Sequence, residues 1–115
     1  MIAVIFEAIP REGRREAYFA SAEALRPLLT EIDGFLSIER FESVTTPGRI
    51  LSLSFWRDED AVRQWRVLEE HRRVQQAGRL SIFADYRLRV AQVIRDYGMV
   101  QRDQAPDDSR LAHDE

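Results

Sequence analysis

The sequence predicts a single α+β domain in which four strands and two helices follow the order β-α-β-β-α-β. Two observations carry this prediction. Residues alternate in type over 2–8, 35–43 and 49–56, which is the two-residue period of a strand with one face on a core. Apolar residues recur at spacings of three and four within 11–32 and 59–77, which is the period of an amphipathic helix.

The first strand and the first helix have recognisable ends. Pro10 closes the alternating segment that begins at Ile2. The helix that follows extends to Ile32, and we expect Pro27, which lacks a backbone N–H, to kink it or to separate its last turn. Asp33-Gly34 then provides the stop. The predicted apolar stripe of this helix consists of Tyr18, Ala22, Leu25, Leu29 and Ile32.

A hairpin and a second helix follow. We expect residues 35–43 and 49–56 to pair as antiparallel strands, because the segment between them contains Thr, Pro and Gly, which favour turns. Asp58 is a typical helix N-cap with acidic residues after it, and Gly78 stands where helices commonly stop. The second helix is therefore expected from Glu59 toward Ala77.

The last strand is expected to be long. Its period-2 pattern begins near Asp85 and continues, after a phase slip at Gln92, to about Gly98. This length exceeds the usual strand of about five or six residues, so we expect its far half to pair with or lie on another chain. The pattern therefore predicts a homodimer.

The element order is the ferredoxin-like split βαβ pattern, with one layer of helices on an antiparallel sheet. Such a sheet has one face without helices. We expect that face to carry Ile5, Ile50 and Trp56, or Leu36 and Ile38, and to be buried against the same face of a second subunit.

Composition and charge exclude several classes of protein. The chain has no cysteine, and its two histidines, His71 and His113, are too few and too far apart for a metal motif, so we expect no bound metal. All 17 basic residues are arginine, which excludes a lysine Schiff base. The net charge of −3 argues against a nucleic-acid partner.

We expect a cytoplasmic protein without contact to a membrane, because the chain has neither an apolar run of membrane-spanning length nor a signal-peptide pattern. The predicted domain comprises residues 1–100. Residues 101–115 are polar and rich in aspartate, so we expect them to form a disordered tail.

The runs LSLSFWRDEDAVRQW, RVLEEHRRVQQAGR and FADYRLRVAQVIRDY resemble the antibiotic biosynthesis monooxygenase (ABM) family. The resemblance covers residues 1–98, and its most specific features are Phe55-Trp56, Trp65, Glu70-His71 and the stop at Gln75 and Gly78-Arg79. It implies a dimeric α/β barrel of ferredoxin-like subunits with a pocket between sheet and helices. Some members of that family oxidise aromatic polyketide-type substrates with dioxygen and without metal or flavin, and relatives degrade haem.

Trp65 and His71 are the first candidate catalytic residues. On an ideal helix they lie at opposite edges of a stripe that faces the sheet, so they can flank one pocket. Neutral His71 could take a phenolic proton, and the Trp65 indole could stack on a flat substrate. The alternative interpretation is that Trp65 packs in the core and that His71 is a solvated or hydrogen-bonded side chain.

The resemblance adds Arg87. Cofactor-free members of the family use a helix tryptophan, a polar aromatic residue six positions later and an arginine on the last strand, and Trp65, His71 and Arg87 occupy these places. This chain has histidine where the family pattern has tyrosine, and Ala61 or Val62 where it has asparagine. Strand alternation also turns Arg87 away from its apolar neighbours, toward the dimer side if those pack on the helices.

Trp56 and Glu7 are candidate substrate-binding residues, with the alternatives that Trp56 lies at a subunit interface and that Glu7 is a solvated edge residue. A haem-degrading relative would have its histidine ligand near Val74 or Gln75, so His71 lies one turn too early. We therefore expect no cofactor, with haem as the weaker alternative.

The sequence thus predicts a cofactor-independent monooxygenase acting on a small aromatic or quinol-like substrate. Three alternatives stay open: a haem-binding or haem-degrading monooxygenase, a non-catalytic dimer that binds a small ligand, and a subunit whose sheet edge or acidic tail recruits another protein.

Overall fold

The fold is described by a computed structural model over residues 1–75 and 82–113, with the backbone alone for residues 70–75 and 113. Its elements are β1 (Ile2–Pro10), α1 (Arg15–Thr30), β2 (Phe35–Glu42), β3 (Ile50–Trp56), α2 (Glu59–Gln75), β4 (Phe83–Gln92) and α3 (Asp107–His113). The predicted order β-α-β-β-α-β is confirmed, and the chain continues after β4 into the short helix α3.

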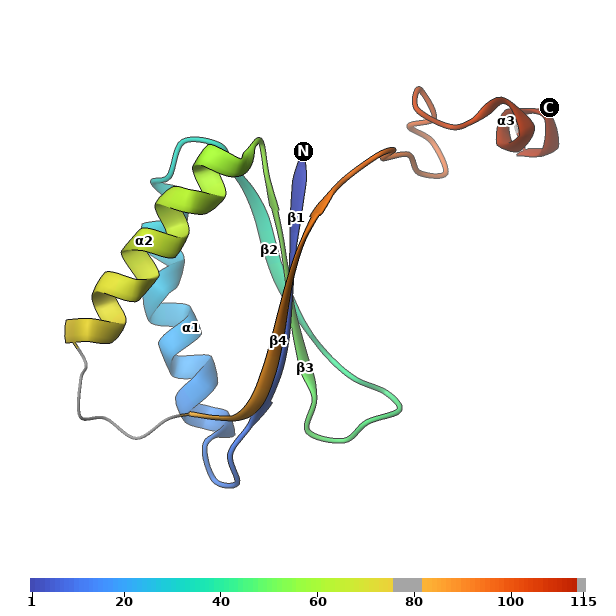
Figure 1. The fold of residues 1–115 in the computed structure, drawn as a ribbon. Helices are drawn as coiled ribbons and strands as arrows, with labels where there is room; N and C mark the ends of the chain where they lie inside the picture. Colours follow the sequence, from blue (N-terminus) through green and yellow to red (C-terminus); the bar gives the residue numbers. More distant parts are fainter. Residues whose placement is uncertain (76–81, 114–115) are drawn as a thin grey trace.

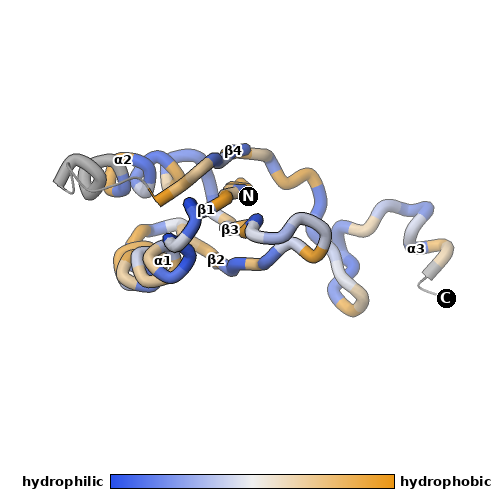
Figure 2. Tube along the Cα trace, turned by 90° about the horizontal axis from the view of Figure 1, so that it is seen from below, coloured by the Kyte–Doolittle hydropathy of each residue, from blue (hydrophilic) through white to orange (hydrophobic). Residues whose placement is uncertain are grey.

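The four strands form one antiparallel sheet in the order β2-β3-β1-β4. Both long helices cover the same face of this sheet (Figure 1), and Figure 2, which looks along the strands, shows neither of them on the other face. The predicted α+β class with a ferredoxin-like arrangement is therefore confirmed.

The strand register decides which side chains face the helices. Ile2 lies opposite Trp56 on β3, and Ala8 lies opposite Ile50. Residues directly opposite each other in an antiparallel pair share a face of the sheet. The core under the helices is the cluster of Ile2, Val4, Leu29, Trp56, Ala61 and Val62, with Ile32, Phe35, Ile38 and Trp65 packed against it.

The predicted composition of the helix-free face is partly wrong. Ile50 and Trp56 are buried on the helix side, whereas Ile5 pairs with Leu53 on the helix-free side. Ile38 also packs against the core cluster. Alternation within one strand shows which of its own residues share a face. Which residues of two different strands share a face depends on the register of their pairing, and neither strand alone determines that register.

The end of β4 also differs from the prediction. The strand ends at Gln92 rather than near Gly98, and residues 93–98 carry no strand in this chain. The chain leaves the sheet there on the helix-free side (Figures 1 and 2) and ends in α3, within the segment predicted to be disordered. The division into a domain of residues 1–100 and a tail stays a prediction.

Across the described residues, none of the helices has both the length and the apolar character that crossing a membrane requires. The cytoplasmic location stays a prediction.

Candidate functional site

Trp65 lies on the helix side of the sheet, one helical turn after Ala61. It is partly buried and packs against the core cluster around Trp56. Trp56 is fully buried, its ring lies edge-on to Phe35, and its Nε1 donates a hydrogen bond of 2.9 Å to Ser54 Oγ. Trp56 therefore supports the core on which Trp65 rests and offers no surface to a substrate in this chain.

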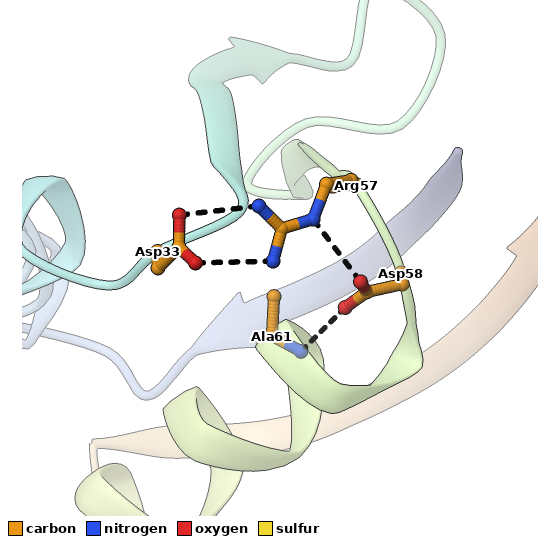
Figure 3. Close-up of polar contacts among 4 residues, drawn as sticks. All are labelled: Asp33, Arg57, Asp58 and Ala61. Atoms are coloured by element: carbon orange, nitrogen blue, oxygen red, sulfur yellow. Dashed lines mark hydrogen bonds and ion pairs between the residues drawn. The ribbon is translucent and has the colours of Figure 1, made fainter.

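The start of α2, which positions Trp65, is held by a chain of polar contacts (Figure 3). Asp58 Oδ1 accepts the backbone N–H of Ala61 at 3.0 Å, which is an N-cap, and Asp58 Oδ2 accepts Arg57 Nε at 3.1 Å. Arg57 also donates both terminal nitrogens to the Asp33 carboxylate at 3.1 and 3.2 Å. The bond from Ala61 and then the one from Arg57 hold the pKa of Asp58 below its ordinary value, and Asp33 and Asp58 raise the pKa of Arg57.

Gly34 allows the start of α2 to pack closely against the beginning of β2. Its φ of +96° belongs to the region that favours glycine, and its carbonyl oxygen accepts the backbone N–H of Arg57 at 2.7 Å. A Cβ at this position would lie 2.9 Å from the Cβ of Ala61. This close approach fixes the position of the first turn of α2 relative to β2, and therefore the position of Trp65 one turn later.

An aromatic cluster occupies the opposite end of the helix side. Phe83 lies 5.5 Å from Phe6, 5.6 Å from Tyr18 and 5.8 Å from Tyr86, measured between ring centroids. Phe6 and Tyr86 are also 5.5 Å apart. These spacings are typical of favourable edge-to-face and tilted ring contacts.

Tyr86, Leu88 and Val90 form an apolar strip on the helix side of β4, which we call the β4 strip. Their exposed fractions are 45–52%, so the helices cover them only in part. Val90 lies opposite Val4, a member of the cluster that supports Trp65, and Tyr86 belongs to the aromatic cluster. The β4 strip therefore joins the two ends of the helix side into one continuous apolar surface.

His71 lies on α2, six residues after Trp65, which corresponds to about 9 Å of helical rise. Its side chain lies outside the described residues. The predicted pairing of Trp65 and His71 at one pocket stays a prediction.

Arg87 and Glu7 lie on the other face of the sheet. They are directly opposite each other, and Glu7 is also opposite Leu51 on the helix-free side. Glu7 Oε1 accepts a hydrogen bond of 3.1 Å from Arg89 Nη1. The structure thus brings Glu7 and Arg87 together but separates both from Trp65 by the thickness of the sheet.

A groove of about 510 Å³ lies along β2, the edge strand of the described sheet, and is also lined by side chains of α1. We call it the edge groove. Its lining residues are Phe19, Glu23, Arg26, Ser37, Ile38, Glu39, Arg40, Phe41, Leu53 and Phe55. Side chains from both faces of the sheet contribute, so the groove wraps around the edge strand.

Among the described residues there is no group of three or more His, Cys, Asp or Glu side chains placed to hold a metal ion.

Comparison with known proteins places this fold in a family. The model of the antibiotic biosynthesis monooxygenase family matches residues 1–77. The chain belongs to this family. It is 47% identical over 93 residues to the jasmonate monooxygenase ABM of Pyricularia oryzae, a match that covers 81% of this chain and 43% of that protein. It is 33% identical over 93 residues to the uncharacterized protein YqjZ of Bacillus subtilis, covering 81% of this chain and 79% of YqjZ.

This ABM chain thus spans less than half the length of the curated jasmonate monooxygenase. Solved structures share its fold. A mutant of MhuD with manganese protoporphyrin IX bound superposes with a TM-score of 0.70 at 14% identity, covering 85% of this chain and 99% of MhuD. Rv0793 from Mycobacterium tuberculosis superposes with a TM-score of 0.67 at 20% identity, covering 84% and 98%. At these identities the likeness concerns the fold alone.

Sequence reasoning did not place Phe6, Tyr18, Phe83 and Tyr86 at a site. The available signal was the parity of each strand: Phe6 shares a face with Val4, and Tyr86 shares one with Leu88 and Val90. Assembling the four rings also requires the register of β1 against β4, which only the fold supplies.

Proposed function

We propose that this member of the ABM family is a cofactor-independent monooxygenase that acts on a small aromatic or quinol-like compound. The observation that supports it is the continuous apolar surface beside Trp65, because a flat substrate can stack on aromatic rings and bury its faces on the β4 strip. The family and the name of the 47% identical relative support the reaction class.

In the proposed reaction a general base removes a phenolic or enolic proton from the substrate. The resulting anion passes an electron to dioxygen, and the radical pair combines at a ring carbon that carries one hydrogen, which gives a peroxide. Loss of that hydrogen as a proton cleaves the O–O bond and leaves one oxygen on the carbon as a carbonyl. The other oxygen leaves as water with this proton and the proton that the base had removed, so the substrate supplies all the electrons.

His71 is the proposed base, and Trp65 is the proposed stacking wall. Oxygen uptake by the purified protein with polyphenols and quinols tests both roles. His71→Ala should lower the rate at least about tenfold, since general bases commonly contribute more than this. The matched control is His113→Ala, which removes the chain's other histidine and should leave the rate unchanged. An unchanged rate in His71→Ala would remove His71 from the mechanism.

Trp65→Ala should raise KM more than it lowers kcat, because stacking acts on the bound substrate as well as on the transition state. Val67→Ala is its control, because Val67 lies on the same helix but is more than half exposed. An equal effect of the two substitutions would contradict a stacking role.

The proposal includes a homodimer. The helix-free face carries Ile5, Leu51, Leu53 and Phe55, all only partly buried, so a second sheet can cover an apolar surface there. Arg87 and Glu7 face the partner in this arrangement. Arg87→Ala separates two roles: a catalytic arginine lowers kcat in a protein that stays dimeric, whereas an interface arginine weakens the dimer. Light scattering at micromolar concentration that shows a monomer would contradict the dimer.

The absence of a cofactor is also part of the proposal. Titration with hemin, followed by reductant in air, tests it through the Soret band. We expect no saturable red-shifted band. A saturable band that bleaches on reduction would assign the protein to haem degradation instead. Stoichiometric ligand binding without oxygen consumption would favour a non-catalytic binding dimer.

A further inference from the structure

The β4 strip carries one polar side-chain group, the hydroxyl of Tyr86, because its other members, Leu88 and Val90, are aliphatic. Tyr86 is 52% exposed in the single chain, and within the described residues its hydroxyl has no hydrogen-bond partner. A phenol hydroxyl can donate a hydrogen bond as well as accept one. The strip therefore offers one directed polar contact on an apolar surface, a composition that is typical of small-molecule sites.

Neighbouring groups hold the ring of Tyr86 in place. Its centroid lies 5.5 Å from that of Phe6 and 5.8 Å from that of Phe83. The backbone N–H of Tyr86 donates a hydrogen bond of 2.9 Å to Asp85 Oδ1. A tyrosine side chain has only two rotatable angles before its hydroxyl, and a ring packed against two others loses little further freedom when a ligand binds. The Tyr86 hydroxyl is therefore a preorganised donor.

Tyr86 lies at the end of the strip that is farther from the start of α2. Val90 pairs with Val4, a member of the cluster on which Trp65 packs, and Tyr86 is four residues, or about 13 Å, along β4 from Val90. α2 and β4 run in opposite directions (Figure 1), so α2 proceeds from Trp65 toward the Tyr86 end. His71 lies about 9 Å of helical rise in that direction. The proposed base and Tyr86 therefore belong to the same end of the apolar surface.

A substrate anion on this surface needs a hydrogen-bond donor, because a charge beside apolar side chains is destabilised unless it is paired or hydrogen-bonded. The other polar residues of β4 are poorly suited to this role. Arg87 and Arg89 lie on the helix-free side, and Asp85 is an acid that would repel an anion. Gln92 lies opposite Ile2, six residues or about 20 Å from Tyr86, at the other end of the strand. On β4, Tyr86 is the side chain that can serve an anion at the end of the surface where the proposed base lies.

We propose that the Tyr86 hydroxyl donates a hydrogen bond to the substrate oxygen from which the base removes a proton. The substrate proton goes to the base and Tyr86 keeps its own, so the hydrogen bond stabilises the anion that reacts with dioxygen. This inference rests on the proposed monooxygenase function and narrows its substrate class. The substrate carries an ionisable phenol or enol oxygen that reaches the Tyr86 end, while its apolar part lies on Leu88 and Val90.

Binding of 4-nitrophenol to the full chain under nitrogen tests this contact without turnover. This phenol ionises near neutral pH, and its neutral and anionic forms absorb at different wavelengths. Dissociation constants are measured on both sides of its pKa for the unsubstituted protein and for Tyr86→Phe, which removes only the hydroxyl. Each comparison is made at one pH, so titration of the protein's own groups cancels. Tyr86→Phe should weaken phenolate binding about tenfold or more, as expected for a hydrogen bond to a charged group, and binding of the neutral phenol by about threefold or less.

Tyr97→Phe is the matched control, since it removes a tyrosine hydroxyl beyond the end of β4 and should leave both constants unchanged. An equal loss for phenol and phenolate in Tyr86→Phe, or no loss, overturns the hydrogen bond. An unsubstituted protein that binds neither form overturns it as well. Oxygen uptake with polyphenols separates the two failures. A loss confined to the phenolate in a protein that consumes no oxygen overturns the monooxygenase and leaves the Tyr86 contact standing, whereas oxygen uptake with an unselective loss overturns the contact alone.

Discussion

Gly34→Ala should destabilise the protein through two separable effects. The first is the backbone: a non-glycine residue at φ +96° costs about 1–2 kcal/mol. The second is steric: the new Cβ would lie 2.9 Å from the Cβ of Ala61, which is fully buried, and overpacking of this kind costs about 1–3 kcal/mol. We therefore expect Gly34→Ala to lower the free energy of unfolding by about 2–5 kcal/mol.

Gly48→Ala isolates the backbone effect. Gly48 has a similar φ of +85°, but nothing lies within 4 Å of its added Cβ, so the loss should be about 1–2 kcal/mol. Urea unfolding followed by circular dichroism measures both variants. Adding Ala61→Gly to Gly34→Ala removes the opposing methyl group and should restore the steric part, so the two substitutions should be non-additive. Equal losses at Gly34 and Gly48, or additivity with Ala61→Gly, would refute the close packing of β2 on α2.

Three further predictions concern the cap, the core and the sheet surface. Asp58→Ala should lower Tm by roughly 4–8 °C by removing the α2 cap. The pKa of Asp58 in the folded protein lies below its ordinary value of 3.8. The Tm difference between the two proteins should therefore be full at about pH 5 and shrink only below pH 3.8, as the folded protein takes up the proton. A Tm difference that shrinks at higher pH would contradict this assignment. Trp56→Ala should cost about 3–5 kcal/mol in urea unfolding, since the side chain is fully buried, and a loss below about 1 kcal/mol would show that the core does not depend on it. Arg89→Ala should cost more than about 1 kcal/mol in thermal unfolding, with little dependence on salt, because its pair with Glu7 is half exposed in the single chain but lies against the partner in the proposed dimer; a loss below about 1 kcal/mol, as for an exposed pair, would contradict that placement.

The order and type of the elements could be predicted because each signal is local. The period of two in β1 and the cap at Asp58 depend only on neighbouring residues, and both are confirmed. The faces could not be predicted in full. Whether Ile50 shares a face with Ile5 or with Ala8 depends on the pairing of β1 with β3, which is a contact between distant segments.

The predicted end of β4 was wrong for a different reason. The apolar pattern after Gln92 is real, since Ile94 and Val100 are apolar, but a strand needs a partner strand, and the described part of the chain supplies none beyond Gln92. Periodicity shows that a segment can pair and not where its partner lies.

The register of β4 separates chemistry from assembly. Tyr86, Leu88 and Val90 face the helices, whereas Arg87 and Arg89 face the helix-free side. In the proposed enzyme the first set forms an apolar surface beside Trp65, on which the substrate anion reacts with dioxygen, and the second set lies against another subunit. Because side chains alternate, a slip of one residue in β4 would place arginines on that surface and leave the apolar set at the interface. In the proposed enzyme the opposition of Val4 to Val90 and of Glu7 to Arg87 is therefore a functional requirement as well as a structural one.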